Sequence, residues 1–182
     1  MRKISSYTKV RKIIAALLRN KTFQLFKIKK QNYLNLGCGP YPNQQFINLD
    51  YRWFPGVDLV WDIMKKLPFQ DNHFYGIFTE HCIEHFNLLQ LEQILKELKR
   101  ILKPKGVLRI VTPDLKKYVN AYHKKSLGDK VENEELLADA QAFNRVFYSG
   151  HDLMSGSRWW NDGHHYIHDE ESLKKLLEGF LS

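Results

Sequence analysis

Two short apolar segments, joined by a turn with two glycines, constrain the fold of this chain more than any other feature. The first segment is Tyr33–Leu36, the turn is Gly37–Pro40, and the second segment is Ile47–Asp50. A short apolar run that is closed by glycine is typical of a buried parallel strand. The pattern therefore predicts an α/β protein in which these two segments are neighbouring strands.

The turn and the acid that ends the second segment indicate nucleoside binding. Gly37 and Gly39 have no Cβ atom, so the backbone there can turn sharply and approach a ligand. Asp50 is placed to accept hydrogen bonds from a ribose diol at the carboxyl edge of the sheet. The turn lacks the third glycine of a dinucleotide site, and no Lys-Ser or Lys-Thr pair follows to form a P-loop. An ordinary tight turn and a plain strand-end acid are the alternatives.

Five segments, taken in this order, resemble the class I S-adenosylmethionine (SAM)-dependent methyltransferases. They are LNLGCGP (34–40), INLD (47–50), DLVWDIMKKLPF (58–69), TEHCIEHF (79–86) and LKELKRILKPKGVLRIVTPD (95–114). Within this family the chain looks most like a small bacterial, type-11-like subgroup that is often associated with cell-surface glycan genes. The resemblance implies a Rossmann-like fold, SAM as cofactor and methyl transfer as the reaction. The segment His164–Phe180 matches more loosely.

The same resemblance assigns the cofactor-binding residues. The glycine turn would approach the methionyl part of SAM through backbone groups, and Asp50 would hold the ribose. Asp62 and Ile63 would lie beside the adenine, although an N-cap in a short turn is the alternative for Asp62. The complete predicted set is Gly37, Cys38, Gly39, Asp50, Asp62, Ile63, Glu80 and His81.

Histidines are the predicted catalytic groups. Because the imidazole of histidine titrates near neutrality, His81 or His165 could act as a general base on a hydroxyl acceptor, whereas an amine acceptor would need only a neutral nitrogen. His81 and His85 are four residues apart, as are Glu80 and Glu84, and we expect each pair to share a helix face. The His-x-x-x-His spacing also suits zinc, but we predict no metal site because the Glu-x-x-His arrangement of a zinc protease is missing.

A second cluster of aromatic and imidazole side chains is predicted to form the acceptor pocket, since flat aromatic faces suit sugar rings. A loop that packs on the core is the alternative. The cluster consists of His151, Trp159, Trp160, His164, His165, Tyr166 and His168.

Hydrophobic periodicity predicts five strands, at 33–36, 46–49, 58–60, 74–79 and 107–111. Helices are expected at 8–20, at 87–102, over most of 115–148 with a break near 126–129, and at 169–178. Only six residues separate Gly39 from Phe46, so the usual first crossover helix cannot fit. The expected sheet is mostly parallel with the order 3-2-1-4-5. We expect this sheet to lack the C-terminal strand pair of the family, which would make the protein either naturally minimal or a fragment. Strand five would then be an exposed edge.

The N-terminal 30 residues form a basic arm. They contain ten Lys or Arg and no acid, whereas the whole chain has a net charge of +8, so the remainder carries −2. The apolar positions Val10, Ile13, Ile14, Leu17 and Leu18 have the spacing of an amphipathic helix. We expect this stripe to pack on the sheet face that the missing helix leaves bare, and the arm to be dispensable for cofactor binding. Binding to an anionic membrane, nucleic-acid binding and a mitochondrial presequence are the alternatives.

These observations predict two parts, the arm 1–30 and a methyltransferase domain 31–182, with 113–168 as an acceptor-side insertion. The leading function is methyl transfer to a saccharide or small-molecule hydroxyl or amine. A catalytically silent SAM-binding partner subunit, and a membrane or nucleic-acid binder that uses the arm, are the alternatives. Expected partners are a glycan or small-molecule acceptor, an anionic membrane at residues 1–30, and another chain at the exposed sheet edge; no specific nucleic acid is expected. Two cysteines and no long apolar run predict a cytoplasmic location, with peripheral attachment to the inner membrane face as the alternative.

Overall fold

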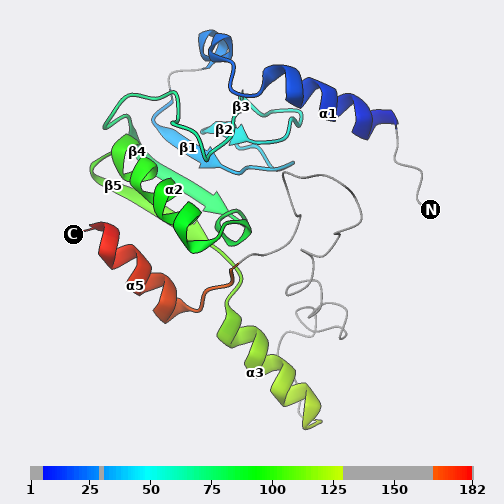
Figure 1. Ribbon diagram of the computed structural model, residues 1–182, viewed down its shortest axis with the longest axis vertical. Helices are drawn as coiled ribbons and strands as arrows, with labels where there is room; N and C mark the ends of the chain where they lie inside the picture. Colours follow the sequence, from blue (N-terminus) through cyan, green and yellow to red (C-terminus); the bar gives the residue numbers. More distant parts are fainter. Residues whose placement is uncertain (1–5, 29–30, 129–165, 182) are drawn as a thin grey trace. The chain divides into compact units, whose positions relative to one another are not determined.

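The computed structural model describes residues 6–28, 31–128 and 166–181 (Figure 1). The chain forms two compact units. The first comprises Met1–Cys82 and Glu92–Val111, and the second comprises Ile83–Leu91 and Thr112–Ser182.

The first unit contains a five-stranded sheet. Its strands are β1 (Tyr33–Leu36), β2 (Ile47–Asp50), β3 (Leu59–Val60), β4 (Phe74–Glu80) and β5 (Leu102–Val111). Their order is β3-β2-β1-β4-β5, and every described pairing is parallel. The fold class and strand order predicted from the sequence are therefore confirmed.

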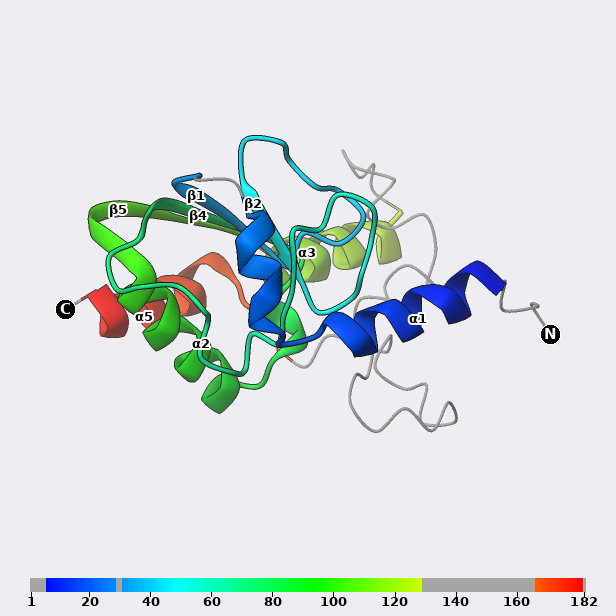
Figure 2. The same ribbon diagram turned by 90° about the horizontal axis from the view of Figure 1, so that it is seen from above.

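One face of this sheet is covered by helix α2 (Leu88–Ile101), as Figures 1 and 2 show. The side chains of Ile94, Leu98 and Ile101 are buried and follow the three- and four-residue spacing of a helix face. Against them the strands contribute Leu34, Leu36 and Ile77, which are also buried. The apolar positions of α2 at helical spacing thus form the contribution of this helix to the core.

The connection between β1 and β2 contains no helix, as its length predicts. The amides of Gly37 and Cys38 both donate to the carbonyl oxygen of Leu49, at 2.8 and 3.1 Å, so the chain turns directly back toward β2. Strand β5 is longer than expected, because it already begins at Leu102, where α2 ends. The four residues 103–106 bulge out between the pairs Phe74–Leu102 and Gly76–Val107, so the expected turn lies inside the strand.

The N-terminal arm seals the outer edge of β3. It consists of α1 (Ser6–Leu18) and a 3-10 helix, η1 (Thr22–Lys27). The amide of Asn20 donates to the carbonyl of Val60 at 3.1 Å, and the amide of Val60 donates to Oε1 of Gln24 at 3.0 Å. Nε2 of Gln24 donates in turn to the carbonyls of Leu18 and Lys21, at 2.7 and 2.9 Å. The backbone of Asn20 and the side chain of Gln24 therefore take the place of a sixth strand at Val60.

The expected burial of the apolar stripe on α1 is only partly met. Ile14 and Leu18 are half-buried, but Val10, Ile13 and Leu17 are exposed. The residue of α1 that is buried is Ala15, on another part of the helix surface. The helix lies against its unit through this small side chain and through Arg11, whose guanidinium lies 5.4 Å from the ring centroid of Phe54.

The second unit contains η2 (Ile83–His85), α3 (Leu115–Ser126) and α5 (Glu170–Leu181). Asp169 begins α5 as its N-cap: its Oδ1 accepts from the amide of Ser172 at 2.8 Å. The amide of Leu115 donates to the carbonyl of His168 at 3.0 Å, which joins the starts of α3 and α5. The expected break after 126 is present, with Gly128 at a φ of +80°. The rest of the expected helical stretch to 148 lies outside the described residues.

Candidate functional site

The glycine turn lies at the point where the strand order reverses, between β1 and β4. In open α/β sheets, ligands bind at the carboxyl ends of the strands at this position. Gly37 and Gly39 have φ values of +69° and +52°, which L-residues rarely adopt. A Cβ atom at Gly37 would lie 2.5 Å from Sγ of Cys82, whereas a Cβ atom at Gly39 would meet none of the described residues within 4 Å. Gly37 is therefore required by packing inside the protein, and the open side of the turn is at Gly39.

Asp50 ties this turn to the end of β2. Its Oδ2 accepts from the amide of Gly39 at 2.8 Å, and its Oδ1 accepts from the amide of Arg52 at 2.7 Å. Burial raises the pKa of the Asp50 carboxyl, while the two backbone donors act in the opposite direction. A carboxylate has about four lone-pair positions, so two acceptor positions remain. The charge and the remaining capacity suit a pair of hydroxyl donors.

Cys38, between the two glycines, contributes backbone and apolar surface rather than thiol chemistry. It is buried, and burial together with the nearby carboxyl of Asp50 raises the pKa of its thiol to about 12. A thiol of that pKa is not ionised near neutrality, so it is a poor nucleophile. This agrees with a role for the turn that is carried by main-chain groups.

Asp62 and Ile63 follow β3 directly. Oδ1 of Asp62 accepts from the amide of Met64 at 3.0 Å. Asp62 therefore also makes the short-turn contact that was the alternative to adenine binding. The amide of Asp62 donates to Oδ1 of Asn20 at 2.8 Å, and the side chain of Ile63 is buried. The arm thus bonds directly to the predicted adenine-side residues, which argues against its being dispensable for cofactor binding.

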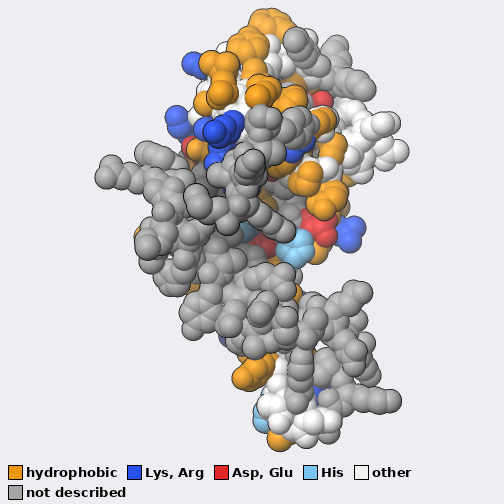
Figure 3. Space-filling view, turned by 90° about the vertical axis from the view of Figure 1, so that its right-hand side faces the viewer, with side chains coloured by type: hydrophobic (Ala, Val, Ile, Leu, Met, Phe, Trp, Pro, Cys, Tyr) orange, Lys and Arg blue, Asp and Glu red, His pale blue; other side chains and the backbone are white. Residues whose placement is uncertain are grey.

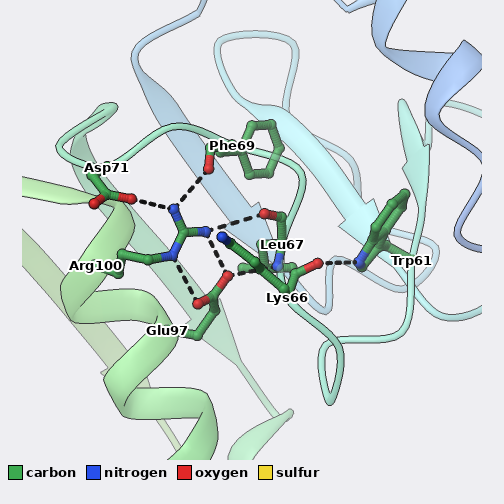
Figure 4. A network of polar contacts seen from close by, with 7 residues as sticks. All are labelled: Trp61, Lys66, Leu67, Phe69, Asp71, Glu97 and Arg100. Carbon is green, nitrogen blue, oxygen red and sulfur yellow. Dashed lines mark hydrogen bonds and ion pairs between the residues drawn. The ribbon is translucent and has the colours of Figure 1, made fainter.

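An arginine of α2 holds the rest of the loop between β3 and β4, as Figure 4 shows. Arg100 pairs with both carboxylate oxygens of Glu97, at 2.6 and 2.9 Å, and with Asp71 at 2.6 Å. Its remaining donors reach the carbonyls of Phe69 and Leu67, at 2.8 and 3.1 Å. Hydrogen bonds from Arg100 hold the pKa of Glu97 below its ordinary value. The network fixes the loop just beyond Asp62.

Glu80 and His81 end β4, and both are exposed. His81 has a φ of +47° and donates its amide to the carbonyl of Val111 at 3.0 Å. A left-handed conformation at a non-glycine residue costs conformational energy and is common at functional sites. The expectation that residues 80–85 share helix faces is wrong: the strand runs to Glu80, and η2 covers only Ile83–His85. The turn at His81 interrupts the four-residue spacing.

The second unit contains its own buried polar residues. Glu84 is fully buried, its backbone carbonyl accepts from the amide of Tyr166 at 3.2 Å, and Thr112 lies 3.5 Å from its carboxylate. His168 is also buried, neither of its ring nitrogens has a hydrogen-bond partner, and burial lowers its pKa. Of the predicted acceptor cluster only Tyr166 and His168 are described, and their rings lie 4.6 Å apart. His165 lies outside the described residues, as do His151, Trp159, Trp160 and His164.

Two residues that support the candidate site, Asn20 and Gln24, were not found from the sequence. The signal that could have found Asn20 is an asparagine just after a helix, because asparagine tolerates the left-handed conformation, here with a φ of +59°. Gln24 has no comparable local signal.

Among the described residues, no group of three or more His, Cys, Asp or Glu side chains is arranged to hold a metal ion. Within the same residues, no helix is both long and apolar enough to cross a membrane.

Comparison with known proteins agrees with this geometry. Residues 41–110 match the model of a family described as "Methyltransferase domain". No curated protein matches the chain. A SAM-dependent methyltransferase from Archaeoglobus fulgidus has a similar structure, with 16% sequence identity, a TM-score of 0.51, and coverage of 97% of this chain and 74% of that one.

The PH0226 protein of Pyrococcus horikoshii OT3 is also similar, with 23% identity and a TM-score of 0.40. The match covers 67% of this chain and 66% of the Pyrococcus protein, so the chain spans just under two thirds of that relative. The match to the methyltransferase domain begins just after the glycine turn and runs into β5, and the Archaeoglobus structure shares the fold. The match agrees with the methyltransferase resemblance predicted from the sequence, and the predicted cofactor SAM is consistent with it. Over residues 41–110 the chain is thus similar to a methyltransferase domain, and it shares the fold of the Archaeoglobus SAM-dependent methyltransferase.

Proposed function

We propose that this protein transfers the methyl group of SAM to a hydroxyl or amine of a saccharide or other small molecule. The observation that supports this best is the bond between Gly39 and Asp50 at the β1–β4 switch point, beside open space. It places a charged acceptor and exposed backbone where a nucleoside cofactor binds in such sheets.

The residues present fit SAM. Asp50 keeps two acceptor positions for the ribose hydroxyls, and the backbone of Gly37–Gly39 would contact the methionyl part. Asp62, whose amide donates to Asn20, and the buried Ile63 that follows it would lie beside the adenine, and the carboxylate of Asp62 can accept from the exocyclic amine. Glu80 and His81 would complete the site from the end of β4.

When bound, SAM supplies an electrophilic methyl group on a sulfonium, so the protein mainly needs to align donor and acceptor. His81 is exposed at the end of β4, and its backbone is held by Val111. Its imidazole is suited to accept the proton of an acceptor hydroxyl as the oxygen attacks. His165 is a second candidate base from the sequence. An amine acceptor would need neither.

Cofactor binding is tested by calorimetry with SAM and with its demethylated product. We expect Asp50→Asn to weaken SAM binding about tenfold, because the amide removes the charge and half of the acceptor capacity. Glu178→Gln changes the charge by the same amount on an exposed position of α5 and should leave affinity unchanged. NAD and ATP should bind more weakly than SAM. Equal affinity for SAM in wild type and Asp50→Asn would refute the site.

The acceptor is tested by turnover against a panel of sugars, lipid-linked glycans and small amines. We expect product with at least one member, and His81→Gln should lower kcat for a hydroxyl acceptor more than for an amine acceptor. SAM binding without turnover on any acceptor would instead support the silent partner-subunit alternative.

A further inference from the structure

The N-terminal arm exposes a row of large apolar side chains. Val10, Ile13 and Leu17 lie at i, i+3 and i+7 of α1 and are 50%, 61% and 67% exposed. In η1, Phe23 is also exposed, and Phe26 is 93% exposed. Exposed large apolar residues that follow helical spacing mark an interaction surface more often than scattered ones do.

Basic side chains flank this row. Lys9 and Lys12 each precede an apolar member of the row by one residue, both are exposed, and Lys21 is exposed just before η1. Residues 1–30 contain no acid, so no charge within the arm's sequence offsets these lysines. Figure 3 shows hydrophobic side chains beside Lys and Arg at the end of the first unit, at the top of the view, where the arm lies.

The arm is held so that this row stays outward. Asn20 and Gln24 bond it to β3, and Arg19 lies with its guanidinium 3.6 Å from the ring centroid of Tyr51 and donates Nε to the carbonyl of Tyr51 at 3.2 Å. These contacts use the inner side of the arm. They are polar, so the apolar row is not needed to attach the arm to the sheet.

We propose that the arm is a docking surface for an anionic lipid membrane. An amphipathic basic helix lies in the interface of such a membrane, with its apolar row among the acyl chains and its lysines near the headgroups. The lysine heads match anionic headgroups in charge, and their alkyl stems extend beside the apolar row. A nucleic acid would use the lysines but would leave Ile13, Leu17 and Phe26 in water, so it explains only half of the surface.

The test uses the full chain and vesicle flotation. Vesicles of neutral phosphatidylcholine are compared with vesicles that also contain phosphatidylglycerol, at low and high ionic strength. We expect binding to the anionic vesicles only, and weaker binding at high salt. The variant Ile13→Ser/Leu17→Ser should reduce partitioning about tenfold or more, because apolar burial in the interface is lost. Lys9→Gln/Lys12→Gln should reduce it severalfold and flatten the salt dependence.

Leu89→Ser is the matched control, because Leu89 is 74% exposed at the start of α2, away from the arm in sequence. It should float as the wild type does, and all variants should keep the wild-type melting temperature. Absence of binding to anionic vesicles, or equal loss in Leu89→Ser, would overturn the proposal. So would a homodimer that Ile13→Ser/Leu17→Ser dissociates in the absence of lipid, or salt-dependent RNA binding that only the lysine variant removes.

Discussion

The two edges of the sheet are protected in different ways. At β3 the edge strand is only two residues long, and Asn20 and Gln24 bond to its outward backbone groups. At the other edge, β5 is ten residues long and has no second strand partner among the described residues. It carries instead Lys103, Pro104, Lys105 and Arg109, which are residue types that discourage strand addition.

The difference shows how burial decides the kind of protection. Leu59 and Val60 are buried, so unpaired amides and carbonyls beside them would be costly and must be bonded within the protein. On β5, Val107 is 66% exposed, so water can satisfy the backbone and the edge needs only charge and proline. Breaking each edge should therefore have very different consequences.

The largest effect is expected for Gln24→Leu. The variant leaves the amide of Val60 without its partner and removes the side-chain donor to the carbonyls of Leu18 and Lys21, which keep their backbone donors. It should lower the free energy of unfolding by about 3 kcal/mol. Thermal or urea unfolding measures this. Gln45→Leu, on an exposed position before β2, is the control and should change stability little. A loss of the same size in both variants would show that the hydrogen bonds of Gln24 at the β3 edge are not specifically required for stability.

A slightly smaller effect is expected for Arg100→Met, which removes the clamp on the loop beyond β3. The carbonyls of Phe69 and Leu67 lose this donor, and the carboxylate of Glu97 loses Arg100 but keeps the amide of Leu67, which together should cost about 2 kcal/mol.

The pH dependence of the free energy of unfolding tests the ion pair between Glu97 and Arg100. The pKa of Glu97 is lowered from its ordinary 4.5, so its stabilising contribution is complete above pH 4.5 and is lost as the pH falls through the lower folded-state pKa. Unfolding measured from neutral to acid pH should show a smaller acid loss in Glu97→Gln and in Arg100→Met than in the wild type. Identical acid profiles in all three proteins would contradict the pairing.

Asn20 connects the sealed edge with the cofactor site. Asn20→Gly keeps a backbone that tolerates the positive φ but removes the bond from Asp62, so SAM affinity should fall about fivefold, or ~1 kcal/mol. Asn20→Ala should add a stability loss of about 1 kcal/mol from left-handed strain. Calorimetry and thermal unfolding of the two variants separate the side-chain bond from the backbone conformation. If neither variant changes SAM affinity, the arm is dispensable for the cofactor, as we expected from the sequence.

The smallest stability effect is expected at the open edge. Arg109→Val removes a charge from β5 and should change the free energy of unfolding by no more than about 0.5 kcal/mol. It should instead promote self-association, which sedimentation velocity at increasing concentration would detect. Lys96→Val removes the same charge from an exposed position of α2 and should not self-associate. A monomeric Arg109→Val protein would mean that charge is not what guards this edge.

Much of the fold could be read from local patterns. The positions of β1, β2 and β4 follow, to within one residue, from short apolar runs, because a buried parallel strand must be apolar on both faces, whereas the strand order was what the family resemblance implied. The absence of a helix between β1 and β2 follows from chain length alone. By contrast, the expectation that the pairs His81/His85 and Glu80/Glu84 share helix faces was wrong, because charged residues with four-residue spacing say nothing about where a strand ends. His81 adopts a left-handed conformation there, and a tertiary bond to Val111 holds it.

The candidate site divides in the same way. The sequence by itself determined the glycine turn, Asp50 at the end of the second strand and the resemblance to the methyltransferases, because these depend on residue types at short spacings. Only the tertiary structure decided that Gly37 faces Cys82 while Gly39 faces open space, and that Asn20 and Gln24 complete the β3 edge. Gln24 and Val60 are 36 residues apart. A hydrogen bond over that separation leaves no periodic trace in the sequence, because it depends on which buried backbone groups the folded sheet leaves without partners.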